Sequence, residues 1–159
     1  MKNCLIRAMT TNKEIRALAV RSTDVVAKAQ ESHQTTPVAT AALGRGLTAG
    51  LLMGSLVKSG NEVSLSIVGN GPLKRVMVHA NYKGEVRGYV GNPKVELLTT
   101  ETGKLDVATA IGSGELIVKK NLGLKEPYQG SVPLVSGEIA EDLTYYFTRS
   151  EEHTSELQS

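Results

Sequence analysis

The sequence predicts an α+β fold, with antiparallel strands and helices in separate stretches of the chain, and three observations support this class. Residues 62–69, EVSLSIVG, alternate apolar and polar side chains, which is the period of a strand with one buried face. Two further strand-like runs follow at once and form an antiparallel meander with the first. An alanine- and glycine-rich stretch starts at Thr36-Pro37, where proline at the first helical position costs no intrahelical hydrogen bond. With 159 residues, 40% of them hydrophobic, the chain can bury the core of one domain.

The N-terminal part is expected to begin with a β-hairpin and two helices. Residues 4–9 (CLIRAM) and 14–21 (EIRALAVR) are β-like runs on either side of the turn TTNK. A helix over 22–34 follows, because its Ser-Thr-Asp start offers caps and its apolar side chains recur on one side. The next helix, expected to stop at Gly60, is so rich in small residues that other elements can approach its backbone closely.

The C-terminal part continues the sheet and closes with a helix. The meander and the elements after it are expected as strands over 62–69, 74–80 and 85–90, a short helix over 104–112, strands over 114–121 and 128–137, and a helix over 136–147. Ser136 is the expected cap of the last helix, because serine is favoured at that position. One face of this helix carries Ile139, Leu143, Tyr146 and Phe147.

The composition of the chain argues against several classes of protein: nucleic-acid-binding, disulfide-bonded, secreted and membrane-spanning proteins. The formal net charge is only +2 and aromatic residues make up 4%, unlike the basic clusters and stacking platforms of nucleic-acid-binding proteins. Cys4 is the only cysteine, so no internal disulfide can form. We expect it in the core as a small apolar residue, with a reactive thiol as the alternative. No signal peptide opens the chain, and Arg45 interrupts its most membrane-like segment, so a cytoplasmic protein without a membrane span is expected.

No stretch of the chain carries a complete catalytic, cofactor-binding or metal-binding motif. Residues 69–74 (GNGPLK) and 102–106 (TGKLD) resemble nucleotide-binding loops only in part, and turn glycines explain both. His33, His79 and His153 are the available imidazole bases, and none lies in a recognisable motif. No HxH, HExxH or DxD spacing indicates a metal site. We therefore expect no catalytic, cofactor-binding or metal-ligating residue, and no enzyme.

Basic residues recur along the meander and leave two interpretations open. They are Lys74, Arg75, Lys83, Arg87 and Lys94. A stripe of cations on one sheet face can contact phosphates, which makes a nucleic-acid-binding module the alternative function. The other interpretation is a solvated face whose charges prevent edge-to-edge association. Only Tyr82 and Tyr89 interleave as aromatics, which favours the solvated face.

Five stretches together resemble one known family, the 33-kilodalton redox-regulated heat-shock chaperone of bacteria. They are TAALGR, GNGPLKRVMVHAN, KGEVRGYVGNP, GKLDVATAIGSGELIVKKNLG and YQGSVPLVSGEIAEDLTYY, and the likeness runs from Cys4 to about Glu151. The resemblance implies an ATP-independent holdase that binds unfolded proteins during oxidative and heat stress. It implies unfolded or misfolded client proteins as partners, and it leaves a homodimer open. It does not say which residues bind clients.

The family regulates its activity through a zinc domain that holds two cysteine pairs, and Cys4 matches none of those positions. The resemblance therefore implies no zinc or other cofactor in this chain. We expect residues 1–151 to be the N-terminal chaperone core, incomplete at its C-terminal end and without the zinc switch. Residues 152–159 are predicted to be a non-native read-through tail, because RSEEHTSELQS resembles a translated sequencing adapter.

Overall fold

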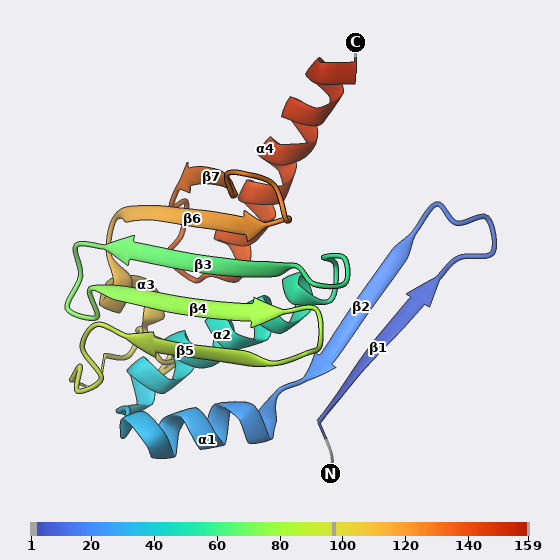
Figure 1. Cartoon of the computed structure of the whole chain (residues 1–159). Coiled ribbons are helices and arrows are strands. Elements are labelled where there is room, and N and C mark those ends of the chain that lie inside the picture. The colour runs from blue at the N-terminus through green and yellow to red at the C-terminus, as the bar shows by residue number, and fades with distance from the viewer. Residues whose placement is uncertain (1–2, 97, 159) are drawn as a thin grey trace.

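A computed structural model describes residues 3–96 and 98–158, with side chains described up to residue 150. Within these residues, helices and two antiparallel sheets make a mixed α+β fold, which confirms the predicted class. The larger sheet has the strand order β5-β4-β3-β6-β7, and the smaller one is the hairpin β1-β2. Helix α2 passes behind the larger sheet in Figure 1, and the hairpin stands apart from that sheet.

The hairpin forms as predicted but contributes little to the core. Strands β1 (Cys4–Met9) and β2 (Arg16–Arg21) pair along their whole length. None of their residues is fully buried, because the hairpin extends away from the larger sheet. Cys4 is exposed, so the expectation of a core cysteine is wrong.

Two helices follow the hairpin, and the second is the central element of the fold. They are α1 (Thr23–His33) and α2 (Pro37–Gly54), and the second starts at the proline as predicted. It ends at Gly54 rather than at Gly60, which lies in the turn before the next strand with a φ of 86°. Residues 55–60 make the turn that leads the chain from this helix into the sheet.

Small residues on α2 let its neighbours approach closely, as predicted. A Cβ placed on Gly44 would lie 3.0 Å from Cγ1 of Val26 on α1. A Cβ placed on Gly50 would lie 2.6 Å from Cγ1 of Val78 on the sheet. Both distances are at or below the closest approach of real side chains, so α2 packs against its two neighbours through bare backbone.

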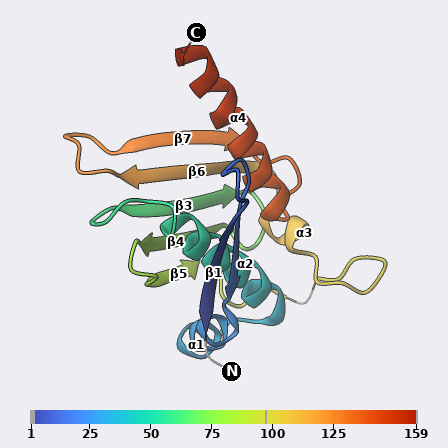
Figure 2. The ribbon, with the colours of Figure 1, turned by 90° about the vertical axis from the view of Figure 1, so that its right-hand side faces the viewer.

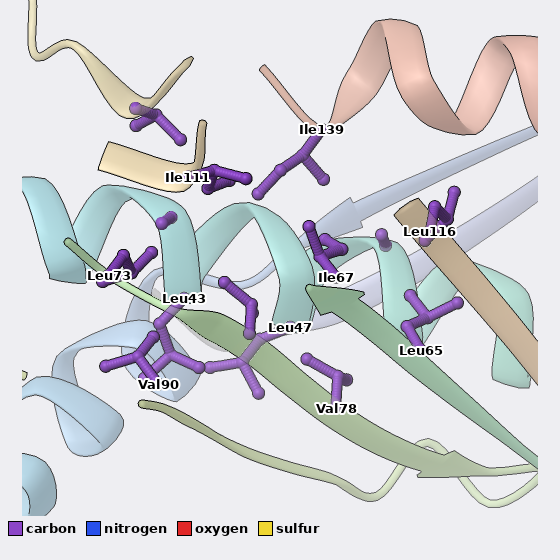
Figure 3. Close-up of a cluster of buried hydrophobic side chains, with 14 of the residues drawn as sticks. Leu43, Leu47, Leu65, Ile67, Leu73, Val78, Val90, Ile111, Leu116 and Ile139 are labelled. Carbon is purple, nitrogen blue, oxygen red and sulfur yellow. The ribbon is translucent and has the colours of Figure 1, made fainter. Parts of the chain in front are cut away.

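Most of the remaining elements lie close to their predicted positions, but the last strand ends at Pro133 rather than at 137, and the last helix runs beyond its predicted end at 147. They are β3 (Glu62–Gly69), β4 (Arg75–Asn81), β5 (Val86–Val90), α3 (Val107–Ile111), β6 (Gly114–Asn121), β7 (Tyr128–Pro133) and α4 (Ala140–Gln158). The strands turn alternate residues inward, and the inward residues of β3 are Val63, Leu65 and Ile67. Leu43 and Leu47 of α2 pack onto this inner face, as Figure 3 shows.

Helix α4 starts later than the sequence predicts. Ser136 was expected to cap it, yet the helix begins at Ala140 and Ser136 lies in the loop before it. The Ser136 hydroxyl accepts a hydrogen bond from the backbone N–H of Glu138 at 3.0 Å. Ile139 is buried and has a φ of 76°, so the chain is not helical at this residue and α4 begins directly after it.

Candidate functional site

An open groove of about 910 Å³ lies along the side of α2 that faces away from the sheet. One wall is α4, with Leu143 and Phe147; the other is the hairpin and α1, with Leu18 and Val26. The floor is α2 itself, where Leu52 is half-buried. The lining is mostly apolar, so the groove can accept an apolar segment but holds few groups that could orient a polar ligand.

The groove exists because α2 is apolar on more than one side. Leu43 and Leu47 pack against the sheet, while Ala41 and Leu52 face the groove. A helix with apolar residues all round is normally buried on every side. Here the described residues cover one side of α2 fully and the other only in part.

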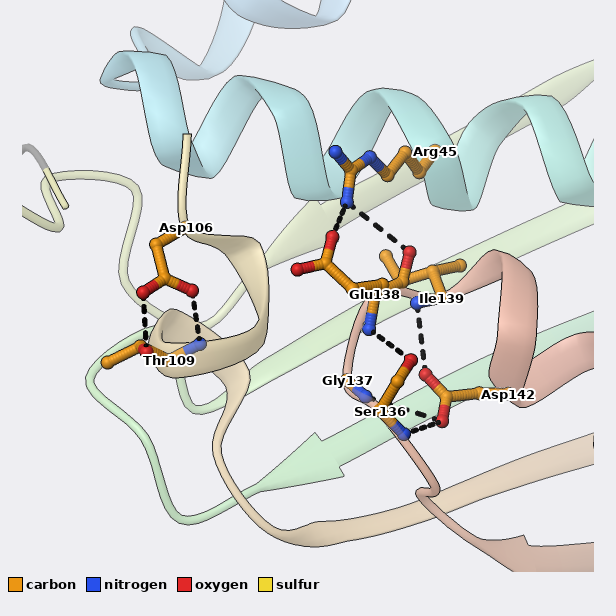
Figure 4. Close-up of polar contacts among 8 residues, drawn as sticks. All are labelled: Arg45, Asp106, Thr109, Ser136, Gly137, Glu138, Ile139 and Asp142. Carbon is orange, nitrogen blue, oxygen red and sulfur yellow. Dashed lines mark hydrogen bonds and ion pairs between the residues drawn. The ribbon is translucent and has the colours of Figure 1, made fainter. Parts of the chain in front are cut away.

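The α4 wall is held by a single buried carboxylate. Asp142 is 1% exposed, and its two oxygens accept hydrogen bonds from the backbone N–H groups of the preceding loop. On the neighbouring side, Nη1 of Arg45 lies 2.6 Å from Oε2 of Glu138 and joins this loop to α2 (Figure 4). Both partners of that ion pair are partly exposed, so it contributes little to stability, and Asp142 fixes the loop.

A second carboxylate orders the end of the groove near Leu105. Asp106 accepts hydrogen bonds from the N–H of Thr109 at 3.0 Å and from its hydroxyl at 2.7 Å, which caps the short helix α3 (Figure 4). These bonds stabilise the ionised form and lower the pKa of Asp106. The capped helix in turn supplies Ile111 to the core.

The two glycine-rich loops are structural, in agreement with the turn interpretation. In residues 69–74, the N–H of Gly71 bonds to the carbonyl of Ile111 at 2.8 Å. A Cβ on Gly69 would lie 2.0 Å from that same carbonyl oxygen, so the loop is packed against α3 and leaves no room for a phosphate. In residues 102–106, Gly103 occupies a turn with a φ of 79°.

The two histidines whose side chains are described, His33 and His79, do not meet at one site. His33 lies in the last turn of α1 and is exposed, whereas His79 lies on β4. Nδ1 of His79 is 2.9 Å from the hydroxyl of Ser64, and its Nε2 is 3.5 Å from Oε2 of Glu62. The side chain of His153 lies outside the described residues.

The basic residues of the meander are dispersed rather than aligned in one stripe. Lys74 and Lys83 lie in turns, and Nζ of Lys94 donates to the carbonyl of Gln34 at 2.7 Å. Of these five residues, only Arg75 and Arg87 lie on the outer face of the sheet, because their neighbours on β4 and β5 point inward. The structure does not support the nucleic-acid alternative.

The groove is not predicted from the sequence, although the sequence carries one signal for it. The segment around α2 is the most membrane-like stretch of the chain, and such a stretch is also the pattern of a helix with two apolar sides. In the residues that the structure describes, no helix is both long and apolar enough to cross a membrane. The same residues hold no group of three or more His, Cys, Asp or Glu side chains placed to bind a metal ion.

Comparison with known proteins assigns the chain to a family. The family model described as Hsp33 protein matches residues 3–159. The chain belongs to the Hsp33 family. Among its relatives, the 33 kDa chaperonin of Geobacillus sp. (strain WCH70) is 48% identical over 99% of this chain and 54% of its own length. The 33 kDa chaperonin of Geobacter sp. (strain M21) is 52% identical over 96% of this chain and 52% of its own length.

A solved Hsp33 structure has the same fold. The crystal structure of the 33 kDa chaperonin of Thermotoga maritima matches with a TM-score of 0.90 at 45% identity, covering 93% of this chain and 51% of that one. The chain thus spans about half the length of the Hsp33 relatives that it matches. The resemblance inferred from the five sequence stretches is confirmed.

Proposed function

We propose that the protein is an ATP-independent chaperone, which binds unfolded or misfolded proteins under heat or oxidative stress and prevents their aggregation. The observation that carries this proposal is the open apolar groove along α2. Unfolding proteins expose apolar segments, and covering such a segment removes apolar surface of both partners from water. The name 33 kDa chaperonin, carried by the relatives, supports the same function.

Several finer points belong to this proposal. We expect a cytoplasmic protein that acts by binding and not by catalysis, with no cofactor in this chain and with a homodimer as one possible assembly. The division into a chaperone core over 1–151 and a non-native tail over 152–159 stays a prediction. Sequencing the genomic locus across residue 152 tests it, and a gene that encodes the same tail would disprove the foreign origin.

The main experiment measures light scattering from a chemically denatured client that is diluted into buffer with the protein, with reductant and without ATP. Suppressed aggregation is expected. A folded protein, shown as such by circular dichroism, that leaves aggregation unchanged would overturn the proposal.

Two matched variants locate the activity in the groove. Leu52→Asp places a charge on the groove floor and is expected to remove at least half of the suppression, because a carboxylate facing an apolar client must be desolvated. Leu124→Asp makes the same change in the loop after β6, where Leu124 is 69% exposed and does not line the groove. Equal suppression by the two variants would contradict the groove as the binding surface.

A further inference from the structure

The free edge of β7 carries backbone groups that no strand among the described residues pairs with. This strand is the last of the five-stranded sheet, and α4 rises past it in Figure 1 and Figure 2. The N–H of Leu134 bonds to the carbonyl of Gly114 on β6 at 2.9 Å. Hydrogen-bonded pairs alternate along an antiparallel ladder, so every second residue back from Leu134 also bonds to β6. The N–H and C=O groups of Gln129 and Ser131 therefore point away from β6, toward the free edge.

A crevice of about 320 Å³ lies between this strand and α4. Its lining on α4 consists of Tyr145, Tyr146, Arg149 and Ser150, and its lining on the sheet is β7 itself. It shares no lining residue with the groove along α2. The crevice is therefore a separate candidate site, with unpaired backbone groups on one side and a helix on the other.

Tyr146 brings an unpaired hydroxyl to the crevice. Its side chain is 3% exposed, and its hydroxyl has no hydrogen-bond partner in the part of the chain that the structure describes. The hydroxyls of Tyr128 and Ser150 lie near enough to influence the pKa of Tyr146, but neither has the geometry of a hydrogen bond to it. Buried polar groups without a partner are costly and rare in folded proteins. This hydroxyl points to a ligand that accepts its hydrogen bond.

The crevice is positively charged at one end. Because Tyr128 and Ser150 both lie near Tyr146, the Tyr128 end of β7 meets the turn of α4 that holds Arg149. Among the residues whose side chains are described, Arg149 forms no ion pair within 4 Å, and no Asp or Glu lines the crevice. Nζ of Lys120 lies 5.8 Å from the centre of the Tyr128 ring and adds a second cation. A guanidinium beside a phenol hydroxyl suits a carboxylate.

We propose that the free edge of β7 binds the C-terminal end of an extended peptide, added as an antiparallel strand with its terminal carboxylate at Arg149 and Tyr146. Gln129 and Ser131 each exchange two backbone hydrogen bonds with the peptide residue opposite. In the antiparallel direction the peptide ends beside Tyr128, where the cations lie. This inference does not rest on the proposed function, because it needs neither the groove nor an unfolded client.

The register gives the peptide a side-chain preference. Its last residue lies opposite Gln129 and its second-last opposite Gly130, which faces inward like its buried partner Val118. A Cβ on Gly130 would lie 3.4 Å from Cε2 of Tyr146, so the glycine leaves part of that ring uncovered. The second-last side chain points inward beside this ring and should be apolar, whereas its two neighbours point outward and can be polar.

The test uses a fluorescent ten-residue peptide that ends in threonine, valine and serine with a free carboxylate, and fluorescence anisotropy as the readout. Binding is expected. The same peptide with a C-terminal amide should bind at least tenfold more weakly, because the charge-assisted hydrogen bonds are lost. Equal binding of the two forms, or no binding of either, would overturn the inference.

Methylation of single peptide nitrogens tests the strand pairing. The third-last residue lies opposite Ser131 and donates its N–H to that carbonyl, so methylating this nitrogen should weaken binding at least tenfold. The N–H of the second-last residue points away from β7, and its methylation is the matched control that should leave binding unchanged. If both methylated peptides bind equally, the peptide is not added as a strand.

Two variants test the carboxylate site. Arg149→Gln and Tyr146→Phe should each weaken binding of the acid peptide about fivefold or more and leave binding of the amide peptide unchanged. Tyr146→Phe removes only an unpaired hydroxyl, so its circular dichroism spectrum should match that of the parent. Arg16→Gln is the matched control, because Arg16 is exposed on the hairpin and does not line the crevice. Binding of the acid peptide that all three variants retain would exclude this carboxylate site.

Two further outcomes separate this inference from others. Displacement of the peptide by acetate at the same concentration would overturn it in favour of a site for free carboxylates. Leu52→Asp in the groove should bind the peptide as the parent does, since Leu52 does not line the crevice. Loss of peptide binding in that variant would place the peptide in the groove and overturn the inference.

Discussion

Replacing Asp142 with alanine should destabilise the protein by about 2 to 6 kcal/mol. Oδ1 of Asp142 accepts from the N–H groups of Val135, Ser136 and Gly137 at 2.7, 3.0 and 3.4 Å, and Oδ2 accepts from that of Ile139 at 3.0 Å. Water can reach the first two donors, because Val135 is 54% exposed and Ser136 is half-buried. The other two are buried and would lose their only acceptor, at about 1 to 3 kcal/mol each.

The assay is urea unfolding followed by far-UV circular dichroism, with the free energy extrapolated to water. Asp142→Asn keeps one acceptor oxygen and turns an amide toward the other donors, so an intermediate loss of about 1 to 3 kcal/mol is expected. The control is Asp24→Ala in the first turn of α1, where only an interaction with the helix dipole is lost, or about 1 kcal/mol at most. A loss below about 1 kcal/mol for Asp142→Ala would refute the reasoning.

Two other perturbations test the packing and the charge state of the fold. Gly69→Ala should lower the free energy of unfolding by about 3 kcal/mol, since the new Cβ would lie 2.0 Å from the carbonyl oxygen of Ile111. Gly123→Ala is the control: its Cβ would meet no atom within 4 Å, but the φ of 75° disfavours alanine, so a loss of about 1 kcal/mol is expected. Similar melting temperatures for the two variants would contradict this. Burial raises the pKa of Tyr146 above its usual value of 10.0, so its stabilising contribution is full below pH 10 and is lost as the pH rises through the raised value. Tyr146→Phe should flatten the alkaline decline in melting temperature, and an unchanged decline would show that other groups cause it.

The strands could be predicted from the sequence because their signal is local. In residues 62–69, apolar and polar side chains alternate, and Val63, Leu65 and Ile67 are all buried in the structure. The start of α4 was not predictable in the same way. Ser136 has the side chain of a cap, but Asp142, six residues later, draws the loop into a conformation that delays the helix. That outcome depends on hydrogen bonds between the loop and a buried carboxylate further along the chain, which helix propensities do not describe.

The candidate groove and the outer face of the sheet depend on contacts between distant parts of the chain, so only some of their residues could be predicted from the sequence. The apolar content of α2 was visible, but the groove also needs Phe147 of α4 and Leu18 of the hairpin. The outer face of the sheet also brings Lys119 on β6 beside Ser64 on β3, two strands that the meander does not join in sequence. Reading the meander alone therefore selected Arg87 and omitted Lys119.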